Sequence, residues 1–81
     1  MLFRKASPVR EVTVGGMFRR SRSDKIVEVA EVTGISPDGF GIPHVRYELT
    51  LERPYSRGNY KAGTKVLALA AFSATYRDAV L

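Results

Sequence analysis

The stretch Val45-Arg46-Tyr47-Glu48-Leu49-Thr50-Leu51-Glu52 alternates apolar and polar side chains. Successive side chains of a β-strand point to opposite faces, so this period of two predicts a strand with one buried face and one face in water. His44, the only histidine, has the parity of Arg46. We therefore expect His44 at the start of this strand, on its solvent-exposed face. The alternative is that His44 forms part of a binding surface.

The residues before this strand predict a hairpin. Ser36-Pro37-Asp38-Gly39 combines a proline, which presets the backbone angle of a turn, with a glycine, which accepts a positive φ. Proline cannot donate a hydrogen bond to a neighbouring strand, so Pro43 is expected to mark the beginning of the second strand or its edge side.

Segment 25–35 is rich in β-branched residues and predicts the first strand of that hairpin, although no single alternation runs through it. A bulge near Ala30 and Glu31 would place three side chains on one core face. A short helix is the alternative, but it has weak helix formers and no clean cap. The side chains that the bulge would bring to the core are those of Val27, Val29 and Val32.

The flanking segments complete the pattern. Residues 12–19 predict a strand interrupted at Gly15-Gly16, followed by a loop over 20–24. A polar loop is expected over 53–64, and the apolar run 65–71 suits a strand buried on both sides. A last short helix or 3₁₀ turn is predicted from the helical spacing of Phe72, Tyr76, Ala79 and Val80.

Short strands at this spacing predict an all-β fold, a small SH3-like antiparallel barrel of about five strands with a C-terminal helical turn. At 81 residues the chain makes one domain, expected over 12–81, after a basic and flexible segment over 1–11. Four stretches resemble a group of small uncharacterised bacterial proteins with an SH3-like barrel. The stretches are Phe18-Arg19-Arg20, residues 27–32, Gly41-Ile42-Pro43-His44-Val45-Arg46-Tyr47, and residues 66–69 with Phe72 and Tyr76. The resemblance implies the five strands and the terminal turn, but it implies no catalytic residue, ligand or substrate.

The net charge of +5 is concentrated in the first third of the chain, where residues 1–25 hold seven basic and two acidic residues. Residues 26–81 hold six of each. Such an asymmetry attracts polyanions through counterion release. The alternative is that the basic residues only keep a small protein soluble.

Catalysis is not indicated. With one histidine and no cysteine, the sequence offers no nucleophile with its base, no set of metal ligands and no glycine-rich phosphate loop. Pairs such as Glu28 with Glu48 are better read as exposed cross-strand charges. We expect a non-enzymatic protein without a cofactor.

A binding module is therefore the leading hypothesis, with RNA or single-stranded DNA as the partner. Aromatic rings stack on bases while basic side chains contact phosphates. A protein-interaction or structural role is the alternative, and the loop tyrosines would then serve as loop anchors. The candidate nucleic-acid-binding residues are Arg19, Arg20, Arg22, Phe40, His44, Arg46, Tyr55, Arg57, Tyr60 and Lys61.

The sequence also bears on the cellular compartment. The N-terminus lacks the apolar stretch of a secretory signal, and the longest apolar run falls far short of the roughly 20 residues that span a bilayer. We expect a cytoplasmic protein with no membrane partner. The oligomeric state is left open.

Overall fold

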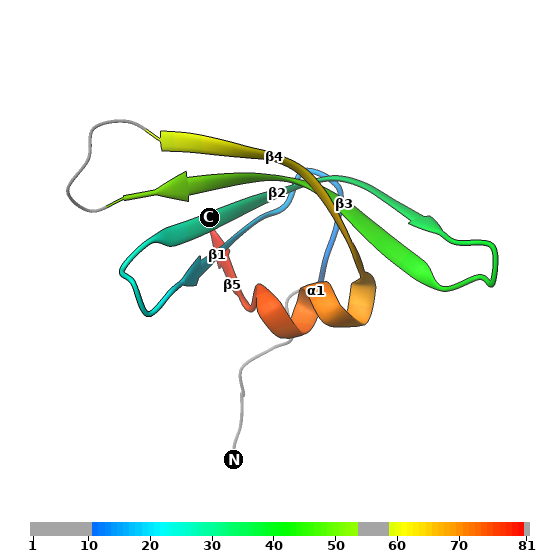
Figure 1. The fold of residues 1–81 in the computed structure, drawn as a ribbon. Helices are drawn as coiled ribbons and strands as arrows, with labels where there is room; N and C mark the ends of the chain where they lie inside the picture. The colour runs from blue at the N-terminus through cyan, green and yellow to red at the C-terminus, as the bar shows by residue number, and fades with distance from the viewer. Residues whose placement is uncertain (1–10, 54–58, 81) are drawn as a thin grey trace, which may run out of the picture.

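The computed structural model describes residues 11–53 and 59–80, which form one antiparallel five-stranded sheet and a short helix. The sheet order is β4-β3-β2-β1-β5, and the helix lies between the two edge strands in the chain (Figure 1). The elements are β1 (Met17–Ser21), β2 (Val27–Pro37), β3 (Pro43–Glu52), β4 (Asn59–Ala68), α1 (Leu69–Thr75) and β5 (Asp78–Val80). The predicted all-β fold of five strands with a helical turn near the C-terminus is confirmed.

The sheet is strongly bent, and α1 packs against β3 and β4 (Figure 1). Strand β1 bridges β2 and β5, which brings the C-terminal strand back to the first one. In the described part of the chain, however, no ladder joins β4 to β5. Closure of the sheet into a barrel is therefore not observed.

The alternation that predicted β3 is confirmed in the first half of the strand, whereas residues 49–52 are all half-buried. Val45 and Tyr47 are buried, whereas Arg46 and Glu48 are exposed. Pro43 begins the strand, as its missing N–H predicted. The predicted hairpin between β2 and β3 is present, but its turn lies two residues later than predicted, over residues 38–42, because Ser36 and Pro37 belong to β2. The glycine with a positive φ is Gly41 and not Gly39.

Strand β2 exists as predicted, but its inward-facing residues were assigned wrongly. Ala30 and Val32 are buried together with Glu28, while the predicted core residues Val27 and Val29 are only half-buried. The register shift falls at Thr33, between Val32 and Gly34, and not near Ala30 and Glu31. A strict alternation does run from 27 to 32, but it places a glutamate in the core.

Several other boundaries differ from the prediction. Strand β1 begins at Met17 and not at residue 12. Arg20 and Ser21 belong to β1, not to the following loop. The polar segment 59–64 is the first half of β4, because edge position lets this strand carry polar side chains on both faces. The apolar run divides at Ala68, where β4 ends and α1 begins, and Ala79 and Val80 lie in β5 rather than in a helix.

The core is built around an aromatic cluster. Phe72 of α1 has an exposed fraction of 0% and lies 5.4, 5.0 and 5.0 Å, between ring centroids, from Phe18, Tyr47 and Tyr76. A helix of seven residues without a side-chain cap has little stability of its own, so this packing is what holds α1 in place. No helix in the described residues is long and apolar enough to cross a membrane.

Candidate nucleic-acid interface

Two hairpins meet at one end of the sheet, where β1 turns into β2 and β3 leads into β4 (Figure 1). The strand register places Arg20, Glu28, Leu51 and Tyr60 in one row across four strands. The next row contains Arg19, Val29, Thr50 and Lys61. We call this region, formed by the described residues 19–29, 50–53 and 59–61, the hairpin end.

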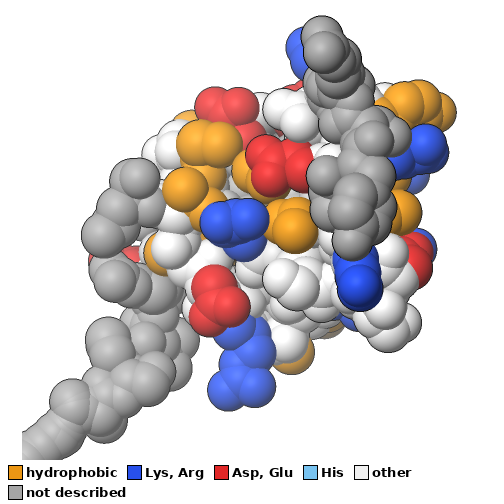
Figure 2. Space-filling view, turned by 90° about the vertical axis from the view of Figure 1, so that its left-hand side faces the viewer, with side chains coloured by type: hydrophobic (Ala, Val, Ile, Leu, Met, Phe, Trp, Pro, Cys, Tyr) orange, Lys and Arg blue, Asp and Glu red, His pale blue; other side chains and the backbone are white. Residues whose placement is uncertain are grey.

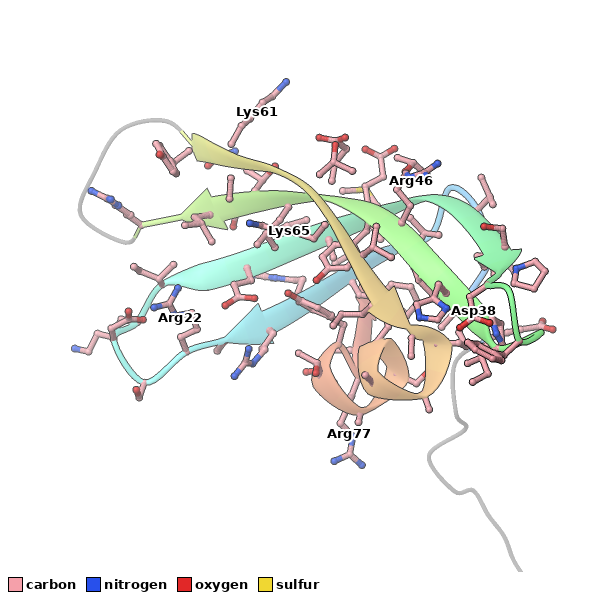
Figure 3. All side chains as sticks on the ribbon, turned by 45° about the vertical axis from the view of Figure 1, so that its right-hand side comes forward. Arg22, Asp38, Arg46, Lys61, Lys65 and Arg77 are labelled. Carbon is pink, nitrogen blue, oxygen red and sulfur yellow. The ribbon has the colours of Figure 1, made fainter. Side chains whose placement is uncertain are left out.

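The two rows lie on opposite faces of the sheet, because directly paired residues share a face and successive rows alternate. Arg20 and Tyr60 share the face of the buried residues, and Tyr60 is 59% exposed where this face opens at the hairpin end. Arg19 and Lys61 lie on the other face. Figure 3 shows Lys61 on β4 and Arg22 near the β1–β2 turn, both at this end of the sheet. The hairpin end therefore carries basic side chains on both faces of the sheet and the Tyr60 ring on one of them.

A buried carboxylate organises the inner side of the hairpin end. Glu28 has an exposed fraction of 7%, and its Oε1 accepts a hydrogen bond of 2.7 Å from the hydroxyl of Tyr76. Its Oε2 lies 3.7 Å from a guanidinium nitrogen of Arg20 and 3.7 Å from one of Arg22. Both arginines are therefore drawn toward one carboxylate oxygen, which compensates for its removal from water.

The tyrosine in this contact is perturbed by its surroundings. Burial raises the pKa of Tyr76, and the hydrogen bond to Glu28 raises it further, because a phenolate beside a carboxylate in a poorly solvated site is disfavoured. Tyr76 therefore stays protonated and remains the hydrogen-bond donor.

Arg22 has a second acidic neighbour, and Arg19 has one as well. Arg22 forms an ion pair of 2.9 Å with Asp24, and Arg19 lies 4.0 Å from Glu52. The view onto the hairpin end accordingly shows Lys and Arg interspersed with Asp, Glu and apolar side chains (Figure 2). An arginine has five N–H donors, so these single contacts leave donors free for an incoming anion.

Three predicted site residues lie elsewhere. Phe40 is in the β2–β3 turn, His44 pairs with Ser36 beside that turn, and Arg46 pairs with Gly34. His44 is eight residues along β3 from Glu52, a distance of about 26 Å. Figure 3 shows Asp38, in that turn, at the opposite end of the sheet from Lys61. The structure therefore does not bring these three residues to the hairpin end.

Two further predicted site residues, Tyr55 and Arg57, lie outside the described residues. Tyr60 and Lys61, which the sequence placed in the same loop, belong to β4. The prediction that Glu28 is an exposed cross-strand charge is wrong, because its carboxylate is buried. The sequence pattern assigned Tyr76 no role at this site. A signal for Glu28 was present, since a glutamate occupied an inward position of an otherwise regular alternation in β2.

The β2–β3 turn is fixed by Asp38. One carboxylate oxygen of Asp38 accepts backbone hydrogen bonds from Phe40 (2.7 Å) and Ile42 (3.0 Å), and its backbone N–H donates to the carbonyl of Ile42 (2.8 Å). His44 Nδ1 lies 2.9 Å from the same carbonyl oxygen. The His44 ring thus contacts the backbone of the turn.

Acid is expected to loosen this turn. The two backbone N–H groups lower the pKa of Asp38 below its ordinary 3.8, so the stabilisation is complete above pH 3.8 and is lost as the pH falls through the lower folded value. In an NMR titration, the amide signals of Phe40 and Ile42 should shift together with the Asp38 carboxyl carbon, with a midpoint below 3.8. A midpoint at or above 3.8 would contradict the hydrogen-bonding pattern.

The described residues contain no group of three or more His, Asp or Glu side chains placed to hold a metal ion. Comparison with protein-family models, with curated proteins and with solved structures found no match. The assignment of function therefore depends on the geometry of the chain itself.

Proposed function

We propose that this chain is a non-enzymatic module that binds single-stranded RNA or DNA at the hairpin end. The observation that supports the proposal is that the strand register places Arg19 and Lys61 at the two ends of one four-strand row, and Arg20 and Tyr60 at the two ends of the adjacent row. These pairs come from segments some forty positions apart in the chain, yet they lie in neighbouring rows of one sheet end.

Each residue type suits a different part of a single-stranded nucleic acid. The exposed ring of Tyr60 offers a face on which a base can stack, which is worth about 1–3 kcal/mol per base. Lys61 and Arg19, on the other face, provide cations for backbone phosphates. A single-stranded RNA or DNA can bend around the end of the β-sheet, whereas a stiff duplex cannot contact both faces of the sheet.

Fluorescence anisotropy with labelled single-stranded and duplex RNA and DNA, titrated at low and at physiological salt, tests the proposal directly. We expect binding of single strands with a steep salt dependence and weaker binding of duplexes. An absence of binding at low salt would reject nucleic acid as the partner. Equal affinity for duplexes would reject the proposed mode of contact.

Substitutions at the hairpin end should separate stacking from charge. We expect Tyr60→Ala to weaken binding by about 5- to 100-fold, because the stacking surface is lost, while Tyr60→Phe retains most of the affinity. Lys61→Ala should reduce the salt slope by about 0.7, the value for one phosphate contact on a single strand.

Arg46→Ala is the matched control for Lys61→Ala, since it removes an exposed cation from the same sheet but away from the hairpin end. It should leave both the affinity and the salt slope close to those of the wild type. Equal losses in the two variants would mean that binding follows net charge and not the proposed site. Arg20 and Arg22 are left unchanged in this test because they compensate the buried Glu28.

A further inference from the structure

The β2–β3 hairpin extends beyond the rest of the sheet. The last pair that β1 makes with β2 joins Met17 to Glu31, and the last pair that β4 makes with β3 joins Ala68 to His44. The pair Pro37–Pro43 and the turn therefore project past both neighbouring strands, as Figure 1 shows at the right of the molecule.

The tip of this hairpin presents apolar side chains to water. Phe40 is 91% exposed, the largest value among the exposed large hydrophobic residues, and Ile42 is 51% exposed. Single apolar side chains are common on protein surfaces, but here two of them lie within three residues of one turn. Covering the Phe40 ring with a partner would release a large apolar area from water.

The tip is also pre-organised. The hydrogen bonds of Asp38 to Phe40 and Ile42 and the prolines on both sides of the turn fix the backbone. Gly41, with a φ of +80°, adopts the left-handed conformation that the turn requires. A fixed backbone lowers the entropy that is lost when a partner binds, so the turn is suited to presenting an anchor side chain.

Charge indicates which class of partner fits. The only acidic or basic side chain in the turn is that of Asp38, and the basic residues of the proposed nucleic-acid site are at the other end of the sheet. A carboxylate disfavours nucleic acid and anionic lipid at this tip. It also disfavours a second copy of the same tip, because two convex tips would bring two carboxylates together.

We propose that the tip Asp38–Ile42 docks into a different protein, inserting the Phe40 ring into an apolar pocket that has a basic side chain at its rim to face Asp38. Oδ1 of Asp38 accepts hydrogen bonds from the two backbone N–H groups, whereas Oδ2 accepts none from the described residues and lies 3.9 Å from Nδ1 of His44. Oδ2 is thus available to a donor from the partner. This inference is independent of nucleic-acid binding.

The test begins with site-specific photo-crosslinking in the cells that produce the protein. A photoreactive phenylalanine analogue at position 40 is compared with the same analogue at position 66, since Val66 is also exposed, at 54%, but lies on β4. We expect a protein that crosslinks from position 40 and not from position 66. If every crosslinked protein is common to both positions, the proposal is overturned.

The affinity of the crosslinked protein for this chain then tests the role of Phe40. The crosslinked protein is purified and titrated by calorimetry with the full chain and with Phe40→Ala, which should weaken binding by about 10- to 100-fold, while Val66→Ala leaves it unchanged. An unchanged affinity for Phe40→Ala overturns the proposal. So does a crosslink between two copies of this chain, or a loss of RNA binding in Phe40→Ala comparable to that in Tyr60→Ala.

Discussion

Phe72→Ala is expected to lower the free energy of unfolding by about 3–5 kcal/mol. The ring is completely buried and contacts three other aromatic rings, so its loss removes apolar burial and leaves a cavity at the junction of α1 with the sheet. A domain of 81 residues has a total stability of about 4–12 kcal/mol. The variant should therefore be marginally folded or unfolded at growth temperature.

Urea unfolding followed by circular dichroism measures this effect. The matched control is Phe40→Ala, which removes the same side chain from a position that is 91% exposed and should change the stability by less than about 0.5 kcal/mol. Similar losses in the two variants would contradict the packing described for α1. Phe72→Leu should recover part of the loss, because it refills part of the cavity.

The fold was largely predictable because β3 and its turn carry unambiguous local signals. A period of two over eight residues predicts only a strand for β3. A proline, an aspartate and glycines between two apolar segments predict a turn, although Pro37 itself is the last residue of β2. The order of the strands and the return of the C-terminus to β1 were not predictable from such signals. They depend on pairing between residues far apart in the chain, which local patterns do not encode.

The error in β2 has a specific cause. An alternation in which only apolar residues face inward does not fit β2, because Glu28 occupies an inward position. A buried carboxylate becomes acceptable only when its partners are known, and Tyr76 lies 48 residues away along the chain. A bulge was therefore predicted where none exists, and the true bulge at Thr33 was missed.

The grouping of the candidate residues depends on the strand register, which the sequence does not encode. The register places Arg19 in the row of Lys61 and Arg20 in the row of Tyr60. In consecutive antiparallel hairpins, successive turns lie at opposite ends of the sheet, so the turn with Phe40 had to lie away from the other two. The order of consecutive antiparallel strands therefore separates Phe40 and His44 from the hairpin end.

Glu28→Ala is expected to destabilise the fold by about 2–3 kcal/mol, because it leaves the hydroxyl of the buried Tyr76 without its acceptor. Tyr76→Phe should cost about 1–3 kcal/mol, since the carboxylate then loses its shortest hydrogen bond. If the two groups act on each other, the double variant should lose less than the two single losses added together. Urea unfolding at neutral pH measures all three, with Glu31→Ala as the control, because Glu31 is an exposed glutamate on the same strand.

The pH dependence of this contact has a definite sign. The pKa of Tyr76 in the folded protein is raised above the ordinary 10.0, first by burial and then by the hydrogen bond to Glu28. The unfolded chain therefore loses the Tyr76 proton before the folded protein does. The stability that the protonated hydroxyl provides is complete below pH 10.0 and declines as the pH rises above that value. The wild type should consequently lose stability more steeply than Tyr76→Phe above pH 10.0, and parallel pH profiles would show that Tyr76 is not held as a protonated donor to Glu28.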